Sequence, residues 1–438
     1  MKALILLGIM VIAVPLAFVA PYMGVLTYIW MAITRPHEWA YVQSAQYSMM
    51  VGAATLLGYL VFELMKRPPK LGANSLMLLV WLQTALGTYL GYNVQNAEIK
   101  FIEFTKVIVI GLLISALVDN EQRVRWLLLV ILTSVAMVTF KDFVGSIIYM
   151  GNVKLTGPGG SFEDNNDYAL LLVMATPIAY YFAKSETSKW LRWGFYGMVV
   201  MTTVTIMFTY SRGGFLGLCA VALTMALRTK YKVTGVAALA LAGILFVNFG
   251  PERVLNRLST IKTADQNDAS AQGRLKAWEV SFGIMRDYPW AGIGMKNILL
   301  IYGKYGDAAE AKVAHNSYLQ CAVDAGIPAL IFFLMMLALT CWRLRVVRRV
   351  LKTRSPDNIT LNYTFGLESA MYGYCVSAFF LSQYAFEILY MIVPLVTSLK
   401  AIARSYEKEA QLRKLVEAAP HSVLADPALP SPAMTASR

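Results

Sequence analysis

The chain has 438 residues, of which 57% are hydrophobic and 15% are charged, and its mean hydropathy is +0.53. A chain of this composition cannot bury its apolar surface in one soluble core, so it is expected to be a polytopic membrane protein. The net charge of +13 does not indicate a nucleic-acid partner, because the basic residues are scattered over the ends of apolar segments and form no single stripe.

Apolar stretches long enough to cross a bilayer recur along the chain. A spanning helix needs about 20 apolar residues. The first stretch, residues 3–34, is interrupted near Pro21 and is expected to stay as an uncleaved anchor, because further apolar stretches follow at once. The other predicted spans are residues 46–65, 74–92, 102–118, 126–148, 168–183, 194–210, 213–228, 233–249, 316–341, 363–383 and 387–404. We therefore expect an all-α fold of about 12 transmembrane helices, with the number of crossings in residues 3–34 left open.

These spans divide the chain into four parts. We predict an N-terminal transmembrane bundle (1–249), a large polar loop with short helices (250–315), C-terminal transmembrane helices (316–406) and a disordered tail (407–438). The four cysteines lie inside or at the edges of spans without CxxC spacing, which supports neither a disulfide framework nor a zinc site.

The Lys and Arg residues of short loops predict the orientation, because they favour the cytoplasmic side. Five basic loops fall on one side of the predicted membrane: residues 66–70, 123–125, 184–192, 228–232 and 343–354. The same alternation places the large loop on the other side, which in a bacterial inner membrane is the periplasm.

The loop over residues 151–167 is rich in glycine and ends in polar residues. Glu163, Asp164 and Asp167, with two asparagines, could ligate Mg²⁺ or Ca²⁺. A glycine-rich turn with an Asx cap on a helix that begins near Tyr168 explains the same residues, and we favour that interpretation.

Arg212 interrupts two apolar runs and marks a turn or a helix break. An arginine at membrane depth usually faces a cavity or an anionic partner, although it can also extend from a turn to the interface. The flanking Gly213 and Gly214 favour a functional role, because they leave room for a ligand to approach the backbone.

Two residues of the large loop carry the chemistry that we expect. Arg274 opens an apolar pattern at helical spacing, which predicts a helix on the membrane surface with a cation at its start. Alternatively, Arg274 only belongs to the solvated face of this helix. Three nearby arginines could also take the functional role: Arg253, Arg257 and Arg286. His315 begins a long apolar span and could act in acid–base catalysis or sit at the interface. No second histidine lies at ligand spacing, so we expect no zinc site.

Polar residues inside the predicted spans stay without an assigned role at this point. They are Lys106, Lys141, Asp142, Asp324, Glu368 and Glu387.

Several short motifs follow one another in a set order. They are Phe162-x-Asp164-x-Asn166-x-x-Ala169, Ser211-Arg212-Gly213, Gly273-Arg274 with Trp278, Pro289-x-x-Gly292-x-Gly294, and His315-Asn316-x-Tyr318-Leu319 with Gly326. Their order and predicted sidedness resemble the O-antigen ligase and polymerase superfamily. The early Tyr28-Ile29-Trp30 and Arg35-Pro36-His37 are similar to its branch of O-glycosylation ligases associated with exosortase systems. Asn165 stands where the family usually has a proline.

The resemblance implies a GT-C-like glycosyltransferase that uses a lipid-linked donor. It implies transfer of a glycan from undecaprenyl pyrophosphate to a hydroxyl group of lipid A core or protein on the periplasmic side. It assigns the general base to His315, the pyrophosphate contacts to Arg212 and Arg274, and further substrate contacts to Asn166, Asn316 and Tyr318. No metal or other cofactor is expected, because the arginines supply positive charge.

Two alternatives stay open. The first is a polymerase of the same superfamily, which differs in its acceptor. The second is a transporter of lipid-linked or anionic solutes, although such proteins often show two related halves and the sequence shows no internal repeat.

Overall fold

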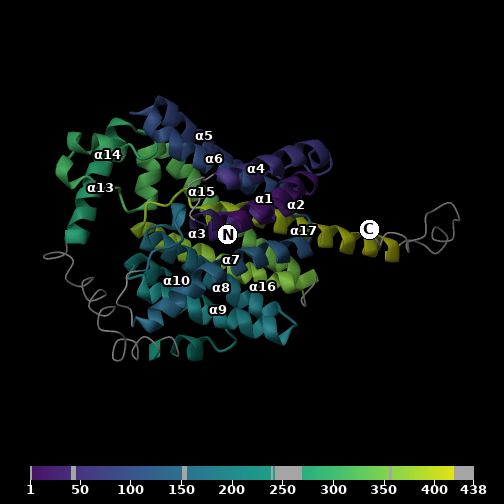
Figure 1. Cartoon of the computed structure of the whole chain (residues 1–438). Coiled ribbons are helices and arrows are strands. Elements are labelled where there is room, and N and C mark those ends of the chain that lie inside the picture. Colours follow the sequence, from purple (N-terminus) through teal and green to yellow (C-terminus); the bar gives the residue numbers. More distant parts are fainter. Residues whose placement is uncertain are drawn as a thin grey trace.

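The computed structural model describes residues 2–40, 46–149, 155–237, 240–241, 269–354 and 358–418. Every regular element in these ranges is a helix (Figure 1), which confirms the all-helical class for the described residues. Most of the predicted span 233–249, with Arg253 and Arg257, lies outside the described residues.

The N-terminal half forms seven α-helices and one π-helical turn. They are α1 (Lys2–Val19), α2 (Pro21–Thr34), α3 (Pro36–Trp39), α4 (Gln46–Gly58), η1 (Tyr59–Glu63), α5 (Ala73–Leu90), α6 (Val94–Leu117) and α7 (Glu121–Ile148). The expected break near Pro21 is confirmed, since α1 ends at Val19 and α2 begins with the proline. A proline suits this first position because its missing N–H group has no partner there in any helix.

The middle of the chain contributes shorter helices and the loop elements. They are η2 (Gly160–Phe162), α8 (Asn165–Ser185), α9 (Lys189–Phe208), α10 (Arg212–Ala226), α13 (Ala269–Asp287), α14 (Ile298–Ile301), η3 (Tyr302–Lys304) and η4 (Ala308–Glu310). Helix α8 packs against α9 and α10, and its side chains are buried along nearly its whole length. Its Asp164 side chain accepts a hydrogen bond from the Asn166 N–H group at 2.8 Å, which confirms the predicted Asx cap.

The C-terminal part closes the bundle. It contains α15 (Ser317–Arg354), α16 (Ile359–Ser377), η5 (Ala378–Phe380) and α17 (Glu387–Ala418). Helix α16 packs on α8 and α10, while α15 packs between α5 and α17. Helix α17 continues to Ala418, past residue 407 where the sequence predicts the disordered tail to begin. Its last residues are mostly strong helix formers such as Glu, Lys, Leu and Ala, which explains the extension.

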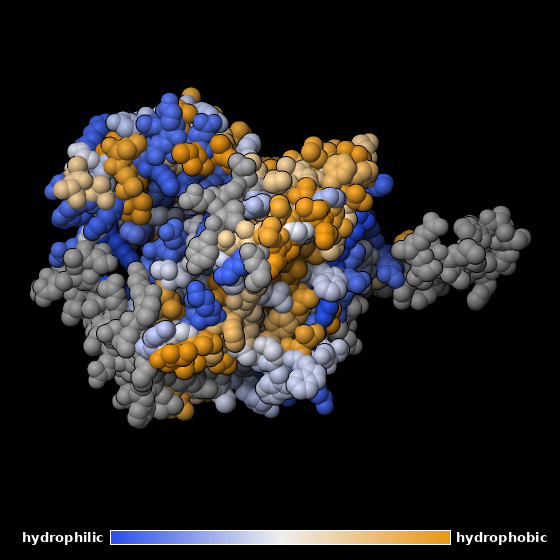
Figure 2. Space-filling model, viewed as in Figure 1, coloured by the Kyte–Doolittle hydropathy of each residue, from blue (hydrophilic) through white to orange (hydrophobic). Residues whose placement is uncertain are grey.

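Five described helices are long and apolar enough to cross a membrane: Lys2–Val19, Glu121–Ile148, Lys189–Phe208, Ser317–Thr353 and Glu387–Leu412. Apolar residues cover the surface where α1, α2 and α4 lie, whereas hydrophilic residues gather around α13 and α14 (Figure 2). On α1, exposed side chains such as Leu4, Val11 and Ile12 face outward, as expected of a surface that contacts lipid. The total of about 12 crossings stays a prediction.

Helix α15 is interrupted at Gly326, and the glycine motif of the large loop packs against this interruption. Gly326 has a φ of 84°. The Ile293 and Gly294 N–H groups donate to the Val323 and Asp324 carbonyls, each at 2.9 Å. The Pro289-x-x-Gly292-x-Gly294 motif therefore joins the loop to α15 through backbone contacts, which fixes the start of α15 beside the loop.

Candidate functional site

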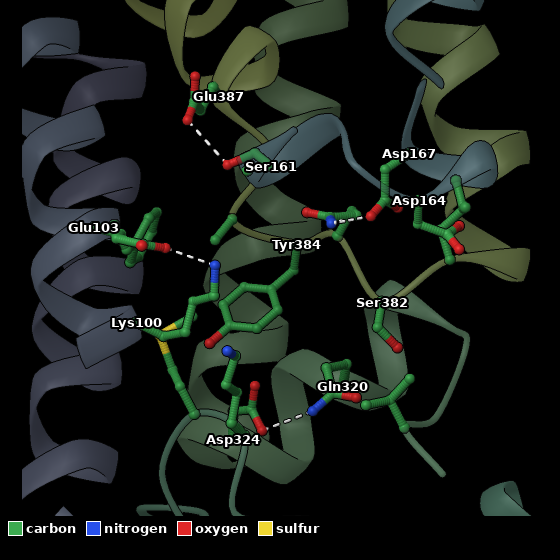
Figure 3. A pocket seen from close by; sticks show the side chains of 18 of the residues that line it. Lys100, Glu103, Ser161, Asp164, Asp167, Gln320, Asp324, Ser382, Tyr384 and Glu387 are labelled. Carbon is green, nitrogen blue, oxygen red and sulfur yellow. Dashed lines mark hydrogen bonds and ion pairs between the residues drawn. The ribbon is translucent and has the colours of Figure 1, made fainter. Parts of the chain in front are cut away.

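A polar cavity of about 370 Å³ lies at the end of the bundle where α8 and α15 begin (Figure 3). Five parts of the chain line it: α6, the η2 loop with the start of α8, the turn before α14, the loop before α15 with its first turns, and the segment from η5 to the first residue of α17. Its volume is within the range of about 300–1,000 Å³ typical of small-molecule sites. His315 and Asn166, two of the residues predicted from sequence, line this cavity.

His315 is half-buried and adopts a left-handed backbone conformation with a φ of 45°. Burial lowers the pKa of its imidazole, and the nearby Arg274 lowers the same pKa further. Asp164 acts in the opposite direction and raises it, while Lys312 lowers it. The imidazole is therefore biased toward its neutral form, which can accept a proton.

The backbone directly before His315 is held from both sides. The Trp278 indole N–H donates to the Ala314 carbonyl at 2.9 Å, and the Ala314 N–H donates to the Gln320 side chain at 3.2 Å. Gln320 in turn donates to the buried Asp324 carboxylate at 2.7 Å. These contacts over-determine the position of His315, as a residue in a rarely populated conformation requires.

The first two motifs meet at the starts of α8 and α10. The Ser211 hydroxyl donates to the Asn166 side-chain oxygen at 2.8 Å and also accepts the Gly214 N–H at 3.0 Å as the N-cap of α10. Asn165 donates to the Thr209 carbonyl at 2.8 Å. The residue that replaces the usual proline thus reinforces the same junction, and Arg212 follows as the first residue of α10.

The glycines after Arg212 serve packing, which corrects the expectation that they leave room for a ligand. A Cβ atom on Gly213 would lie 2.8 Å from the Phe380 Cβ, and one on Gly214 would lie 2.6 Å from the Ala169 Cβ. Such separations are too short for carbon atoms, so these positions need glycine for the close approach of α10 to α8 and η5.

Arg274 lies on α13 near His315. The sequence pattern predicted that Arg274 lies at the start of this helix. The helix already includes Ala269, so Arg274 lies inside it and that prediction is wrong. The Lys312 ammonium lies 2.6 Å from where a Cβ on Gly273 would be, and both Arg274 and Lys312 lower the pKa of His315. Two cationic side chains thus lie on the α13 side of the histidine.

Asn316 and Tyr318 point away from the polar cavity. The Asn316 side chain caps α15 by accepting the N–H groups of Tyr318 and Leu319, at 3.0 and 3.2 Å. The Tyr318 hydroxyl donates to the Cys375 carbonyl at 2.8 Å. Both residues line a second, apolar groove of about 770 Å³ that runs from Trp278 and Phe282 along α15 to Arg345.

Sequence reasoning assigned no role to several residues of the polar cavity. Ser161 donates to Glu387 at 3.0 Å, Gln383 donates to Asp167 at 2.7 Å, and Lys100 pairs with Glu103 at 2.5 Å (Figure 3). Burial raises the pKa of Asp167 to about 7. The available signal was the presence of polar residues within apolar stretches, which had marked Asp324 and Glu387 as unexplained.

The described residues contain no group of three or more His, Cys, Asp or Glu side chains placed to hold a metal ion. Two of the three carboxylates of the 151–167 loop have other partners: Asp164 caps α8 and Asp167 accepts from Gln383. This arrangement agrees with the cap interpretation of that loop.

Two family models match the chain. Residues 197–334 match the model described as O-Antigen ligase (Wzy_C), a segment that contains Arg212, Arg274 and His315. Residues 1–187, which contain Asn166, match a family of unknown function (DUF5935). No curated protein matches the chain.

Proposed function

We propose that this protein moves a glycan from undecaprenyl pyrophosphate to a hydroxyl group of lipid A core or protein, because residues 197–334 match the model of the O-antigen ligase family. We place the reaction at the periplasmic face of a bacterial inner membrane. The main support is the position of His315, between the cations Arg274 and Lys312 and a cavity lined by hydrogen-bonding oxygens. Assignment to the exosortase-associated branch stays a prediction.

The leaving group requires positive charge more than a strong acid. Pyrophosphate departs readily once its charge is held, and a guanidinium binds phosphate oxygens in pairs while it stays charged. We assign this role to Arg274 and Arg212, with Lys312 beside Gly273 as a further cation that the sequence had not indicated. Since these cations supply the charge, we expect no metal requirement.

The acceptor hydroxyl needs a base. Neutral His315 takes the acceptor proton as the oxygen forms its bond to the anomeric carbon, and the bond from that carbon to the pyrophosphate oxygen breaks. Undecaprenyl pyrophosphate leaves with the electron pair. One such displacement inverts the anomeric configuration. General base catalysis of this kind contributes about 10²–10⁴ in rate.

The apolar groove supports a donor with a long lipid chain. Trp278 lines the groove on α13, one helical turn after Arg274, and Asn316 lines it directly after His315. A polyprenyl chain in the groove would bring its pyrophosphate group to the cations, and burial of its apolar surface would favour binding.

The test is glycan transfer from undecaprenyl pyrophosphate by the purified protein in detergent, with lipid A core, protein and glycan acceptors. We expect His315→Ala to lower the rate by about 10²–10⁴, and Arg212→Ala and Arg274→Ala to raise the donor KM. The matched control is Arg286→Ala, which should leave transfer unchanged, because this exposed arginine of α13 is not among the residues that line the polar cavity or the apolar groove.

Each outcome separates the candidate functions. Transfer only to a growing glycan of the same repeat would identify a polymerase instead of a ligase. Full transfer by His315→Ala would refute the base role. Movement of the lipid-linked glycan across vesicles without transfer to any acceptor would replace the proposal with transport, and loss of transfer in EDTA with recovery in Mg²⁺ would contradict the metal independence.

A further inference from the structure

The loop that leads to Ser161 rests on an ion pair from the N-terminal part of the chain. The Arg35 Nε–H donates to the Glu38 carboxylate at 2.7 Å, and both side chains lie against the backbone of the loop. A Cβ atom added to Gly159 would overlap the Glu38 carboxylate, and one added to Gly160 would overlap the Arg35 guanidinium. The two glycines have positive φ values, of 104° and 57°. The loop can therefore pass directly over the pair only because these two residues have no side chain.

The same loop forms part of the wall of the polar cavity. Gly160 and Ser161 line the cavity, and Ser161 donates to the Glu387 carboxylate at 3.0 Å (Figure 3). Asp164 follows three residues later, also lines the cavity and caps α8. Arg35 is close enough to act electrostatically on Glu387 as well. A shift of this backbone would therefore displace Ser161 and the start of α8 together.

The backbone of Arg35 indicates that its side chain is needed at this position. Arg35 ends α2 and precedes α3 with a φ of 46° and a ψ of 57°, and its N–H donates to the Met31 carbonyl at 3.0 Å. This is the left-handed position after a helix, which glycine or asparagine occupies at little cost. An arginine costs more free energy there, and a strained residue beside a candidate site supports a hypothesis of function.

We propose that the Arg35–Glu38 pair positions the backbone of this loop and thereby keeps Ser161 and Asp164 in place in the wall of the active site. Both residues of the pair act through the loop and are positioning residues. The inference rests on the proposed function, because the loop affects transfer only if the cavity is the active site. The pair and the loop lie in residues 1–187, outside the segment that matches the O-antigen ligase model, so the N-terminal part of the chain would complete the site.

Arg35→Asn separates positioning from stability. Asparagine adopts the left-handed conformation readily, so the unfolding temperature should not fall, but its short side chain does not replace the contact with Glu38. We expect the kcat of glycan transfer to fall about tenfold with the donor KM unchanged, because a displaced wall misaligns the acceptor with the base. An arginine with a merely structural role would give the reverse, a lower unfolding temperature and an unchanged kcat, and this result would overturn the proposal.

The partner residue and a distant ion pair supply the controls. Glu38→Ala should lower kcat as Arg35→Asn does, while Glu38→Gln should keep it, since an amide oxygen still accepts the Arg35 N–H. Arg67→Asn should leave kcat unchanged, because Arg67 also pairs with a glutamate, Glu63 at 2.9 Å, but does not line the cavity. Equal losses in Arg35→Asn and Arg67→Asn, or in the two Glu38 variants, would overturn the positioning role.

Thiol labelling tests the position of the loop without any reaction. In the full-length protein without its four native cysteines, Ser161→Cys places a thiol in the cavity wall. We expect methyl methanethiosulfonate, which is small and uncharged, to label it about fivefold faster when Arg35→Asn is added, since one stabilising contact is lost. Glu163→Cys is the control, because Glu163 is exposed in the same loop and does not line the cavity, so its labelling rate should not change. Equal rates for Ser161→Cys in the two backgrounds would contradict the proposal.

The two measurements distinguish this failure from failure of the proposed function. Faster labelling of Ser161→Cys with Arg35→Asn, in a protein that transfers no glycan, would support the positioning of the loop and reject the glycosyltransferase. Transfer by the wild type with an unchanged kcat in Arg35→Asn would reject the positioning role alone.

Discussion

Residues in left-handed backbone conformations gather around the candidate site. The described residues include four such positions other than glycine: Arg35, Tyr210, Lys296 and His315. Lys296 and His315 line the polar cavity, and Tyr210 directly precedes the Ser211 that binds Asn166. Conformations of this kind cost about 1–3 kcal/mol and persist only where the surroundings hold them. The surrounding contacts must therefore offset this cost at the end of the bundle that holds the candidate site.

Gln320 is the residue that we expect to position His315. It binds the Ala314 N–H group and the Asp324 carboxylate, and Gln320→Met keeps the length of the side chain while it removes both contacts. We expect kcat to fall about tenfold, because a displaced base loses alignment with the acceptor, with little change in the donor KM. Transfer kinetics at several donor concentrations measure this, and an unchanged kcat in folded protein would contradict it.

The pH dependence of transfer should report the environment of His315. The lowered pKa keeps the imidazole neutral to lower pH, so activity should be present above that pKa and lost as the pH falls through it, below the ordinary histidine value of about 6.5. Lys312→Gln should move this acid limb to higher pH, because it removes a cation that lowers the pKa.

Asp164→Asn gives the opposite test, because it removes the charge that raises the pKa of His315 and should move the limb to lower pH. Asparagine caps a helix about as well as aspartate, so α8 should keep its start. Profiles of kcat/KM against pH measure both shifts, and shifts in the same direction would show that the limb belongs to another group.

At the level of elements, the large loop packs against the bundle at Gly326, where α15 is interrupted. A Cβ atom on Gly326 would lie 2.3 Å from the Trp290 carbonyl oxygen, and its φ of 84° with a ψ of 168° is a conformation that essentially only glycine adopts, at a cost of about 1–3 kcal/mol for any other residue. We expect Gly326→Ala to lower the thermal unfolding temperature. Gly197→Ala on α9 is the control, because nothing lies within 4 Å of its added Cβ and alanine favours a helix. Equal stability of the two variants would show that the break is not constrained.

The sequence predicted the helices better than it predicted the cavity. Apolar length and the prolines marked most helices within a few residues, and two residues of the motifs, His315 and Asn166, line the polar cavity. The cavity also needs Lys100, Tyr384 and Glu387, which come from segments far apart in the chain. No local pattern connects such residues, because only tertiary packing brings them together. The same limit explains why Gly213 and Gly214 suggested a ligand when they serve helix packing.

The whole molecule has two chemically different ends. Helices α10 and α15 begin at the end that holds Arg212 and His315, and both run to an end where Arg228, Arg345 and Arg348 pair with Glu368. Glu368 is 1% exposed and binds all three guanidinium groups, which gives a role to a residue that had none from sequence. This arrangement is compatible with the predicted orientation, in which the arginine end is cytoplasmic.

Cysteine labelling in intact cells tests that orientation. In a background without the four native cysteines, we expect Gln272→Cys on α13 to react with a membrane-impermeant maleimide. Lys352→Cys on α15 should react only after the cells are opened, since it lies at the basic end. Both positions are exposed on the protein surface, so the side of the membrane that the maleimide can reach decides whether each cysteine is labelled. Labelling of Lys352→Cys in intact cells would reverse the proposed topology.

The pairing with Glu368 also has a consequence for biosynthesis. A ribosome makes Arg228 first, the arginines of α15 next and Glu368 last, 140 positions after Arg228. While the early helices enter the bilayer, the arginines are not yet neutralised by this carboxylate and can retain their end of the chain on the side of the ribosome. In the predicted orientation, this carboxylate follows all three arginines in the chain, so it joins α10, α15 and α16 without weakening the signal that we expect to orient them.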